Sequence, residues 1–137
     1  MPEKLLFRLP LGVRWGDMDA FNHVNNAAVA TYLEEARMRW FASLGGGWID
    51  AQVQPILAAQ TINYRLPIEW PADLVVELKV ERVGRTSLTL AFRMVSATEA
   101  PLRHHADGSH VLVWIDPASG RAAPLPEAVR AAAAAAT

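Results

Sequence analysis

The chain has 137 residues, of which 52% are hydrophobic and 20% are charged, and its formal net charge is −1. This balance predicts one globular domain over residues 1–137 with a buried core, and it argues against binding to nucleic acid or to an anionic membrane. The absence of cysteine excludes disulfides, thiolate zinc sites and a cysteine nucleophile, and it fits an expected cytoplasmic location.

The N-terminal segment has a short apolar patch that Arg8 and Pro10 interrupt, so we expect no signal peptide there. No apolar run along the chain is long enough for a membrane span. A first strand is predicted from about Leu5 to residues 13–15. Because Pro10 cannot donate a ladder hydrogen bond, this strand is expected at a sheet edge or in an irregular conformation.

Residues 14–26, RWGDMDAFNHVNN, concentrate polar groups directly before an apolar segment. Asp17, Asp19, His23 and the pair Asn25–Asn26 fall within them. Burial of ionisable groups without partners costs free energy, so this cluster indicates a functional site more than a turn without a function. If a helix starts here, its free N–H groups and dipole also suit developing negative charge.

Residues 27–44 have the apolar spacing of a helix, which Gly45, Gly46 and Gly47 should end. The apolar stripe consists of Val29, Leu33, Ala36, Trp40 and Leu44. The segment is more apolar than a surface helix requires, so we expect it to lie inside a curved sheet. On its polar side, Glu35 and Arg39 have the favourable i,i+4 order for an ion pair.

Four strands are predicted after this helix. Residues 56–66 precede Pro67, and residues 74–81 and 87–95 alternate in polarity on either side of a turn at 83–85. The last strand covers residues 110–115. Asp107–Gly108 is either a hairpin turn before it or a bulge in a longer strand that starts near Leu102, after a turn at 99–101, and we favour the bulge.

The C-terminal residues 127–137 are predicted to form a short, frayed helix whose alanines have nothing to bury, with Pro126 at its first position. The order of strand, helix and four strands predicts an α+β fold with a five-stranded antiparallel sheet. One helix covers only part of such a sheet and its edges need protection, so at least a homodimer is expected.

Residues 14–26, followed by YLEEAR at 32–37, closely resemble the start of hotdog-fold acyl-CoA thioesterases of the 4-hydroxybenzoyl-CoA thioesterase type. The pattern of that family is D-x-D-x-x-G-H-V-N-N, leading into the central helix. Residues 83–95 and 113–126 resemble its later segments. The resemblance implies a hotdog fold, with the antiparallel sheet wrapped around one long central helix, and assembly into homodimers, often into homotetramers.

This chain has Asn22 where the family has glycine. Asn is the non-glycine residue that best tolerates positive φ, so the turn is expected to form. The exchange affects the expected width of the acyl pocket more than the chemistry. The depth of that pocket should depend on packing around Trp40, Trp48, Tyr64 and the partner subunit.

The resemblance implies that Asp19 is the catalytic carboxylate, as general base or nucleophile, and that the backbone N–H near Asn26 polarises the thioester carbonyl. The alternative for Asp19 is a turn-forming residue. Asp17 lies two residues away and is expected to be structural, paired with Arg14. His23 either contacts substrate or water or fixes the turn, and Asn25 is either a substrate contact or a helix cap.

By the same resemblance, Arg85, Thr86 and Ser87 are candidates to bind the pantetheine arm of coenzyme A, which is part of the substrate, so no separate cofactor is expected. The other cationic candidates for coenzyme A are Arg82, Arg93 and Arg103. Glu34 and Glu35 are expected to be solvated or dimer-facing, although some hotdog enzymes carry a catalytic carboxylate on this helix. We expect His104, His105 and His110 at the surface or at an edge.

A metal site built from Asp17, Asp19 and His23 has too few ligands, and an EF-hand loop is excluded because Phe21 occupies its next ligand position. The expected function is therefore hydrolysis of a fatty-acyl- or aroyl-CoA thioester. Two alternatives stay open: a hotdog dehydratase that pairs His23 with an acid, and a non-catalytic acyl-CoA binding or regulatory module.

Overall fold

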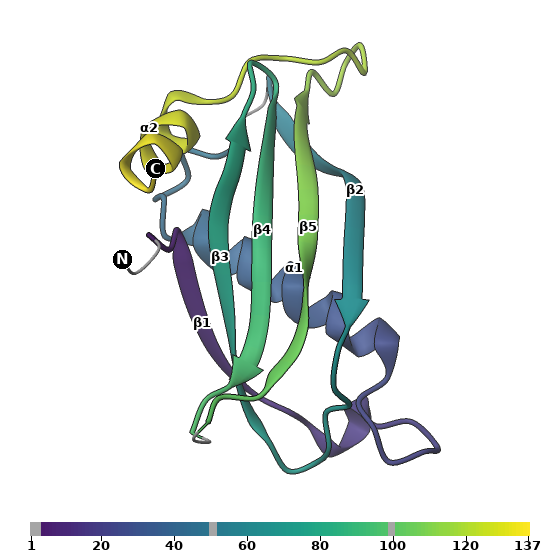
Figure 1. Cartoon of the computed structure of the whole chain (residues 1–137). Helices are drawn as coiled ribbons and strands as arrows, with labels where there is room; N and C mark the ends of the chain where they lie inside the picture. The colour runs from purple at the N-terminus through teal and green to yellow at the C-terminus, as the bar shows by residue number, and fades with distance from the viewer. Residues whose placement is uncertain (1–3, 50–51, 99–100) are drawn as a thin grey trace.

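The computed structural model describes residues 4–49, 52–98 and 101–137. Within these residues, two helices and five strands follow one another, and Figure 1 shows how they are arranged. Their bounds are β1 Phe7–Gly12, α1 Asn26–Ala42, β2 Gln54–Tyr64, β3 Asp73–Val83, β4 Ser87–Ser96, β5 His104–Ile115 and α2 Glu127–Ala135, with a 3-10 turn at Trp15–Asp17.

All five strands form one antiparallel sheet in the order β1-β3-β4-β5-β2. The prediction of a five-stranded antiparallel α+β fold is therefore confirmed. Pro10 lies on the short edge strand β1, as expected, because an edge strand leaves one side of the ladder without a partner. This strand ends at Gly12, and Trp15 already belongs to the 3-10 turn, so the predicted end at residues 13–15 is wrong.

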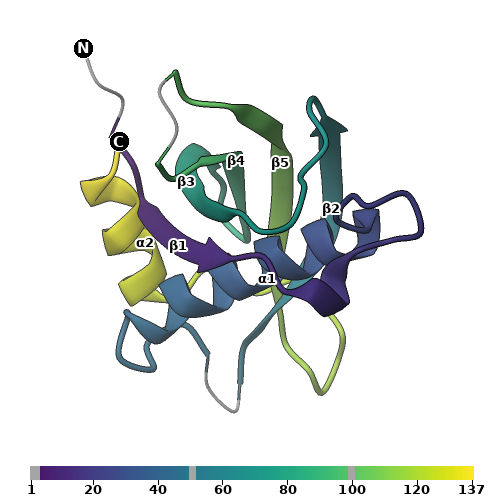
Figure 2. The same ribbon diagram turned by 90° about the horizontal axis from the view of Figure 1, so that it is seen from below.

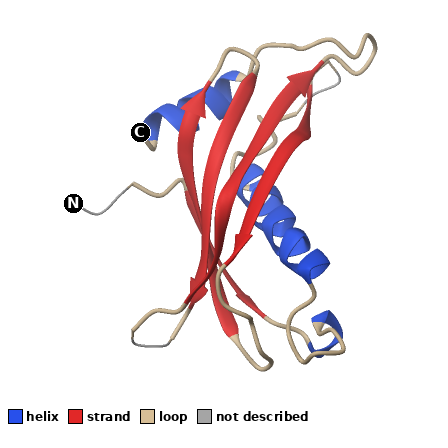
Figure 3. Cartoon of the chain, turned by 45° about the vertical axis from the view of Figure 1, so that its right-hand side comes forward, coloured by secondary structure: helices blue, strands red, loops and turns tan. Residues whose placement is uncertain are grey.

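The helix α1 lies across one face of the sheet, as Figures 2 and 3 show. Its buried residues recur every three or four positions, and the predicted stripe from Val29 to Trp40 is buried, while Leu44 is only partly buried. The opposite side of α1 is exposed, including Met38. The helix is 17 residues long and packs against the sheet from one side, so the expectation of a long helix inside it is wrong.

The inward face of the sheet supplies the other half of the core. Strand β3 places Leu74, Val76 and Leu78 there, and all three are completely buried. Strand β4 contributes its predicted row in the same way, with Leu88, Leu90, Phe92 and Met94. The alternation that predicted these two strands therefore reports which face is buried.

Strand β5 is one continuous strand, which confirms the favoured interpretation over a hairpin at Asp107–Gly108. The bulge lies elsewhere, however. The pairing of β4 with β5 shifts between Met94 and Val95, whose partners are Ala106 and His104, so the extra residue is His105. Of the expected turn at 99–101, residues 99 and 100 lie outside the described residues.

The helix α2 packs into the core, which the sequence did not indicate. Val129 and Ala133 are completely buried, and Arg130 donates hydrogen bonds to the carbonyl oxygens of Gly84 and Arg85 in the turn between β3 and β4. The expectation that the alanine run buries nothing is wrong, and Pro126 caps this helix instead of starting it. Neither helix of the described residues is long and apolar enough to cross a membrane.

Gly108 is required by close packing between β5 and β2. Its φ is +154°, and a Cβ atom at this position would clash with the carbonyl oxygen of Thr61. We predict that Gly108→Ala lowers the free energy of unfolding by roughly 3 kcal/mol or more, since backbone strain and a clash coincide. The measurement is urea denaturation followed by circular dichroism.

The matched control is Gly16→Ala, because a Cβ atom there would have no neighbour within 4 Å. That variant should stay within about 0.5 kcal/mol of the wild type. Equal stability of the two variants would show that the approach of Thr61 to Gly108 does not constrain the sheet.

Candidate active site at the start of α1

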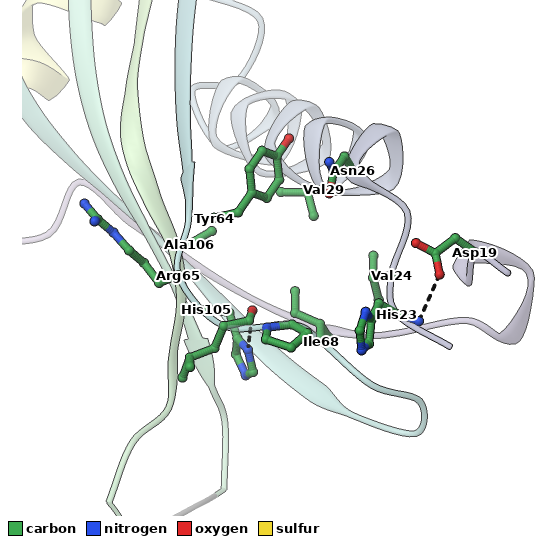
Figure 4. Close-up of a pocket in the computed structure, with 12 residues that line it drawn as sticks. Asp19, His23, Val24, Asn26, Val29, Tyr64, Arg65, Ile68, His105 and Ala106 are labelled. Carbon is green, nitrogen blue, oxygen red and sulfur yellow. Dashed lines mark hydrogen bonds between the residues drawn. The ribbon is translucent and has the colours of Figure 1, made fainter. Parts of the chain in front are cut away.

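A cavity of about 250 Å³ lies between the start of α1, the loop before it and the end of β2 (Figure 4). Asp19, His23 and Asn26 line it together, so the structure brings the three predicted catalytic residues to one place. Its apolar wall includes Val24, Val29, Ile68 and Ala106. The cavity therefore combines a polar end with a surface suited to an apolar acyl group.

Asp17 fixes the loop to the helix. Its carboxylate forms a 2.9 Å ion pair with Arg14 and accepts a 2.6 Å hydrogen bond from the Tyr32 hydroxyl, and its carbonyl accepts the N–H of Asn25. The side chain is buried, and the hydrogen bond from Arg14 holds its pKa below the ordinary value. The predicted structural role and the pairing with Arg14 are confirmed.

Asp19 closes the turn that follows. Its Oδ1 accepts the backbone N–H groups of Phe21 and His23 at 2.8 and 3.1 Å, and Asn22 has the predicted positive φ, at 64°. The second carboxylate oxygen, Oδ2, has no hydrogen-bond partner among residues 4–49, 52–98 and 101–137. The turn therefore orients Asp19 through one oxygen and leaves the other available to the cavity.

Asn25 and Asn26 have different roles at the start of α1. The side chain of Asn25 accepts the N–H of Ala27 at 2.9 Å, which makes Asn25 the N-cap, and it does not line the cavity. Asn26 is the first residue of α1, and its own N–H has no acceptor within the part of the chain that the structure describes. That free N–H, at the positive end of the helix dipole, suits an oxyanion.

The remaining predicted residues lie in other places. Arg85, Thr86 and Ser87 belong to the turn between β3 and β4 and the start of β4. In Figure 1 this turn lies at the opposite end of the sheet from the end of β2 and the start of α1, whose residues line the cavity. Within one chain the structure therefore does not bring them to Asp19. On the outer side of α1, Glu35 pairs with Arg39 as expected, at 3.3 Å, and Glu34 is exposed.

The sequence did not place the histidines correctly. Of the three expected at the surface or at an edge, His105 and His110 are buried and His104 is partly exposed, so the expectation is wrong for the first two. His105 lines the cavity through the bulge in β5, and its Nδ1 lies 3.3 Å from the carbonyl oxygen of Leu66. In the described ranges, no group of three or more His, Asp or Glu residues could hold a metal ion.

The end of β2 also forms part of the cavity, through Tyr64 and Arg65. Arg65 pairs with Asp107 across the sheet at 3.0 Å and, together with Asn63 and His104, lowers the pKa of that carboxyl to about 2. Of the aromatic residues expected to set the pocket depth, only Tyr64 lines the cavity. Trp40 is buried near the other end of α1, and Trp48 stacks on Phe41, so neither one reaches it.

The chain is similar to known proteins along nearly its whole length. The model of the thioesterase-like superfamily matches residues 13–133. The PA2801 protein of Pseudomonas aeruginosa is 40% identical, with 93% of this chain and 98% of that chain covered and a TM-score of 0.87. A protein of Xanthomonas campestris, described as "a putative acyl-CoA thioesterase", is 41% identical, with 88% and 99% covered and a TM-score of 0.78.

A third structure is a thioesterase from Thermus thermophilus in complex with coenzyme A and Zn. It is 31% identical, with 98% of this chain and 96% of that chain covered and a TM-score of 0.79. The chain belongs to the thioesterase-like superfamily, and it is a thioester hydrolase. The superfamily expected from residues 14–26 is therefore confirmed, while the 4-hydroxybenzoyl-CoA type stays a prediction.

The lowered pKa of Asp17 predicts a pH dependence of stability. A carboxyl whose pKa is lowered by folding stabilises the protein at pH values above its pKa in the unfolded chain, which is near 3.8. This contribution to stability is lost as the pH falls through the pKa of the same carboxyl in the folded protein. We predict that Asp17→Asn lowers the melting temperature at neutral pH and that its difference from the wild type shrinks below about pH 4. Thermal denaturation between pH 2 and 8 (roughly the range where carboxyls titrate) is the measurement.

Glu35→Gln serves as the control, because Glu35 forms only an exposed pair with Arg39. Exposed pairs of this kind contribute little, so this variant should follow the wild-type profile. A constant difference between Asp17→Asn and the wild type at every pH would contradict the proposed ionisation.

Proposed function

We propose that the protein hydrolyses acyl-CoA thioesters, with the Asp19 carboxylate as general base or nucleophile and the Asn26 N–H as oxyanion donor. The observation that carries this proposal is their meeting in one cavity, where Asp19 Oδ2 and the Asn26 N–H have no partner among the described residues. Superfamily membership and the coenzyme A bound to the Thermus thermophilus thioesterase support the substrate class.

Thioester hydrolysis requires little more than these two groups. The leaving thiol has a pKa of about 8.5, by analogy with cysteine, so it departs as a thiolate without a strong acid. Asp19 either activates water for attack on the carbonyl carbon or attacks it to form an anhydride that water then cleaves. In both routes the carbonyl oxygen becomes negative next to the helix start, which the free N–H stabilises.

His23 has two roles consistent with its place at the cavity. Its backbone N–H and carbonyl both bind Asp19, which fixes the turn, while its ring lines the cavity and is available to substrate or water. A dehydratase would use that ring to abstract a proton next to the carbonyl, and a binding module would use neither group for chemistry. Superfamily membership favours hydrolysis over both.

Replacement of Asp19 by asparagine tests the chemistry. Asparagine keeps an oxygen that accepts the N–H groups of Phe21 and His23, so the turn is retained, but it has neither basicity nor nucleophilicity. We predict that Asp19→Asn lowers kcat by roughly 10²–10⁴-fold with a small effect on KM. Release of free thiol from a panel of acyl- and aroyl-CoA esters is the measurement.

Asp116→Asn is the matched control, because Asp116 also accepts a backbone N–H two residues later, that of Ala118. It lies in the loop after β5, at the end of the sheet away from the cavity (Figure 1), and its variant should keep wild-type activity. Equal rates for Asp19→Asn and the wild type would exclude Asp19 as the catalyst. No thiol release from any ester would favour the binding module.

We also propose that two copies pair through β2. This edge strand has 11 residues against six in β1, and Ile56 and Leu57 are 45% and 42% exposed on it. A long apolar edge is a template for another strand. Antiparallel pairing of two β2 edges would bring the β3–β4 turn of the partner to the end that carries the cavity, where Arg85, Thr86 and Ser87 could contact coenzyme A.

Light scattering tests this assembly. We predict a homodimer for the wild type and a shift toward monomer for Leu57→Lys, because the charge would be buried at the paired edge. Leu102→Lys is the control, since Leu102 is also exposed, at 56%, but lies before β5 and away from the β2 edge. A dimer that tolerates both substitutions equally would place the interface elsewhere.

A further inference from the structure

The core between α1 and the sheet contains a cation with no anionic partner. Arg37 of α1 is only 6% exposed, and its Nη1 donates to His110 Nδ1 at 2.8 Å and to Gln60 Oε1 at 3.1 Å. No carboxylate of residues 4–49, 52–98 or 101–137 lies within ion-pair distance of it. Burial lowers the pKa of Arg37. The charge of the exposed Glu34 raises this pKa, but its effect is smaller than that of burial.

His110 adds an unpaired donor beside this cation. It is completely buried on β5, and because its Nδ1 accepts from Arg37, the proton of the neutral ring lies on Nε2. Burial and the Arg37 charge lower the pKa of His110 to about 3, so the ring is neutral near pH 7. Its Nε2 has no hydrogen-bond partner within the described part of the chain.

Both groups lie in line with the cavity. Tyr64 and Ala106, which line the cavity, pair across β2 and β5, and two positions further along the same face Ile62 pairs with Gly108. The next pair on this face is Gln60 with His110, which carries the unpaired nitrogen. The row of inward positions therefore runs from the cavity to the polar cluster, whose residues Arg37, Gln60 and His110 lie beyond the lining of the cavity itself.

The helix follows the same direction. On its β2 side, Asn26 is followed by Ala30, by the completely buried Leu33 and then by Arg37, so an acyl chain that reaches Arg37 displaces the Leu33 side chain. Side chains of a helix lean toward its N-terminus, so the guanidinium lies over the turn near residue 33. Seven residues from Asn26 correspond to roughly 10 Å at the helical rise, which is within the length of a medium-chain acyl group.

We propose that Arg37 and His110 form a subsite for a carboxylate at the far end of the acyl group, so that the preferred substrates are ω-carboxyacyl-CoA thioesters of medium length. A carboxylate there would neutralise the buried guanidinium and accept the hydrogen bond of His110 Nε2 at once. A neutral methyl end satisfies neither group. The inference rests on the proposed acyl-CoA hydrolysis and specifies its substrate class.

The experiment compares esters of equal length. Adipyl-CoA is measured against hexanoyl-CoA, and suberyl-CoA against octanoyl-CoA, with kcat/KM as the readout. We expect the wild type to favour the carboxylated ester at least about tenfold, the size of one charge-assisted hydrogen bond. Arg37→Met should lose this preference and still hydrolyse the neutral esters, because Arg37 contacts neither Asp19 nor Asn26.

Arg39→Met is the matched control, since Arg39 lies on the same helix but pairs only with Glu35 at the surface. It should keep the wild-type preference. In case Arg37→Met does not fold, the wild type and Asp19→Asn are heated with suberate or octanoate, and suberate is expected to raise the melting temperature more than octanoate.

The outcomes separate the two proposals. No hydrolysis of any ester would overturn the proposed function, whereas hydrolysis that depends on Asp19 without a preference for carboxylated esters would overturn only this subsite. A preference that survives in Arg37→Met, or suberate and octanoate acting alike, would overturn it too. Loss of the dimer in Arg37→Met with unchanged selectivity would assign the buried cation to the subunit interface instead.

Discussion

The carboxylate of Asp17 is the interaction on which the geometry of the site depends. It joins Arg14, in the loop after β1, to Tyr32, in the second turn of α1, while its carbonyl holds Asn25 at the helix start. The loop that carries Asp19 is therefore attached on both sides to a buried anchor. A turn closed only by its own hydrogen bonds would leave a catalytic carboxylate free to move, and small displacements reduce catalysis strongly.

Two buried charges in this molecule differ in whether neighbouring groups neutralise them. Asp17 is fully compensated by a cation and a hydroxyl, which is typical of a structural ion that orders its surroundings. Arg37 is held by two neutral acceptors and lies beside a histidine with an unpaired nitrogen. Because a buried cation without an anion is costly, its retention in the core indicates a binding requirement more than a contribution to stability.

The sequence predicted those features that depend on neighbouring residues. Alternation located β3 and β4, the three-to-four spacing located α1, and the tolerance of Asn22 for positive φ preserved the turn. The sequence did not predict features that depend on contacts between segments far apart in the chain. Nothing local to His105 shows the bulge that turns it to the cavity, and nothing local to Ala133 shows the core that α2 covers. Polar residue type alone placed His110 at the surface, whereas its strand position buries it.

The same distinction separates chemistry from selectivity. The groups proposed for hydrolysis lie within residues 17–26, because one turn and one helix start supply both a carboxylate and a free N–H. The groups proposed for recognition of the acyl end come from α1, β2 and β5, and only the register of the sheet brings Arg37, Gln60 and His110 together. A change at these three positions leaves the turn at Asp19 intact, so substrate choice can vary in this fold without altering the catalytic step.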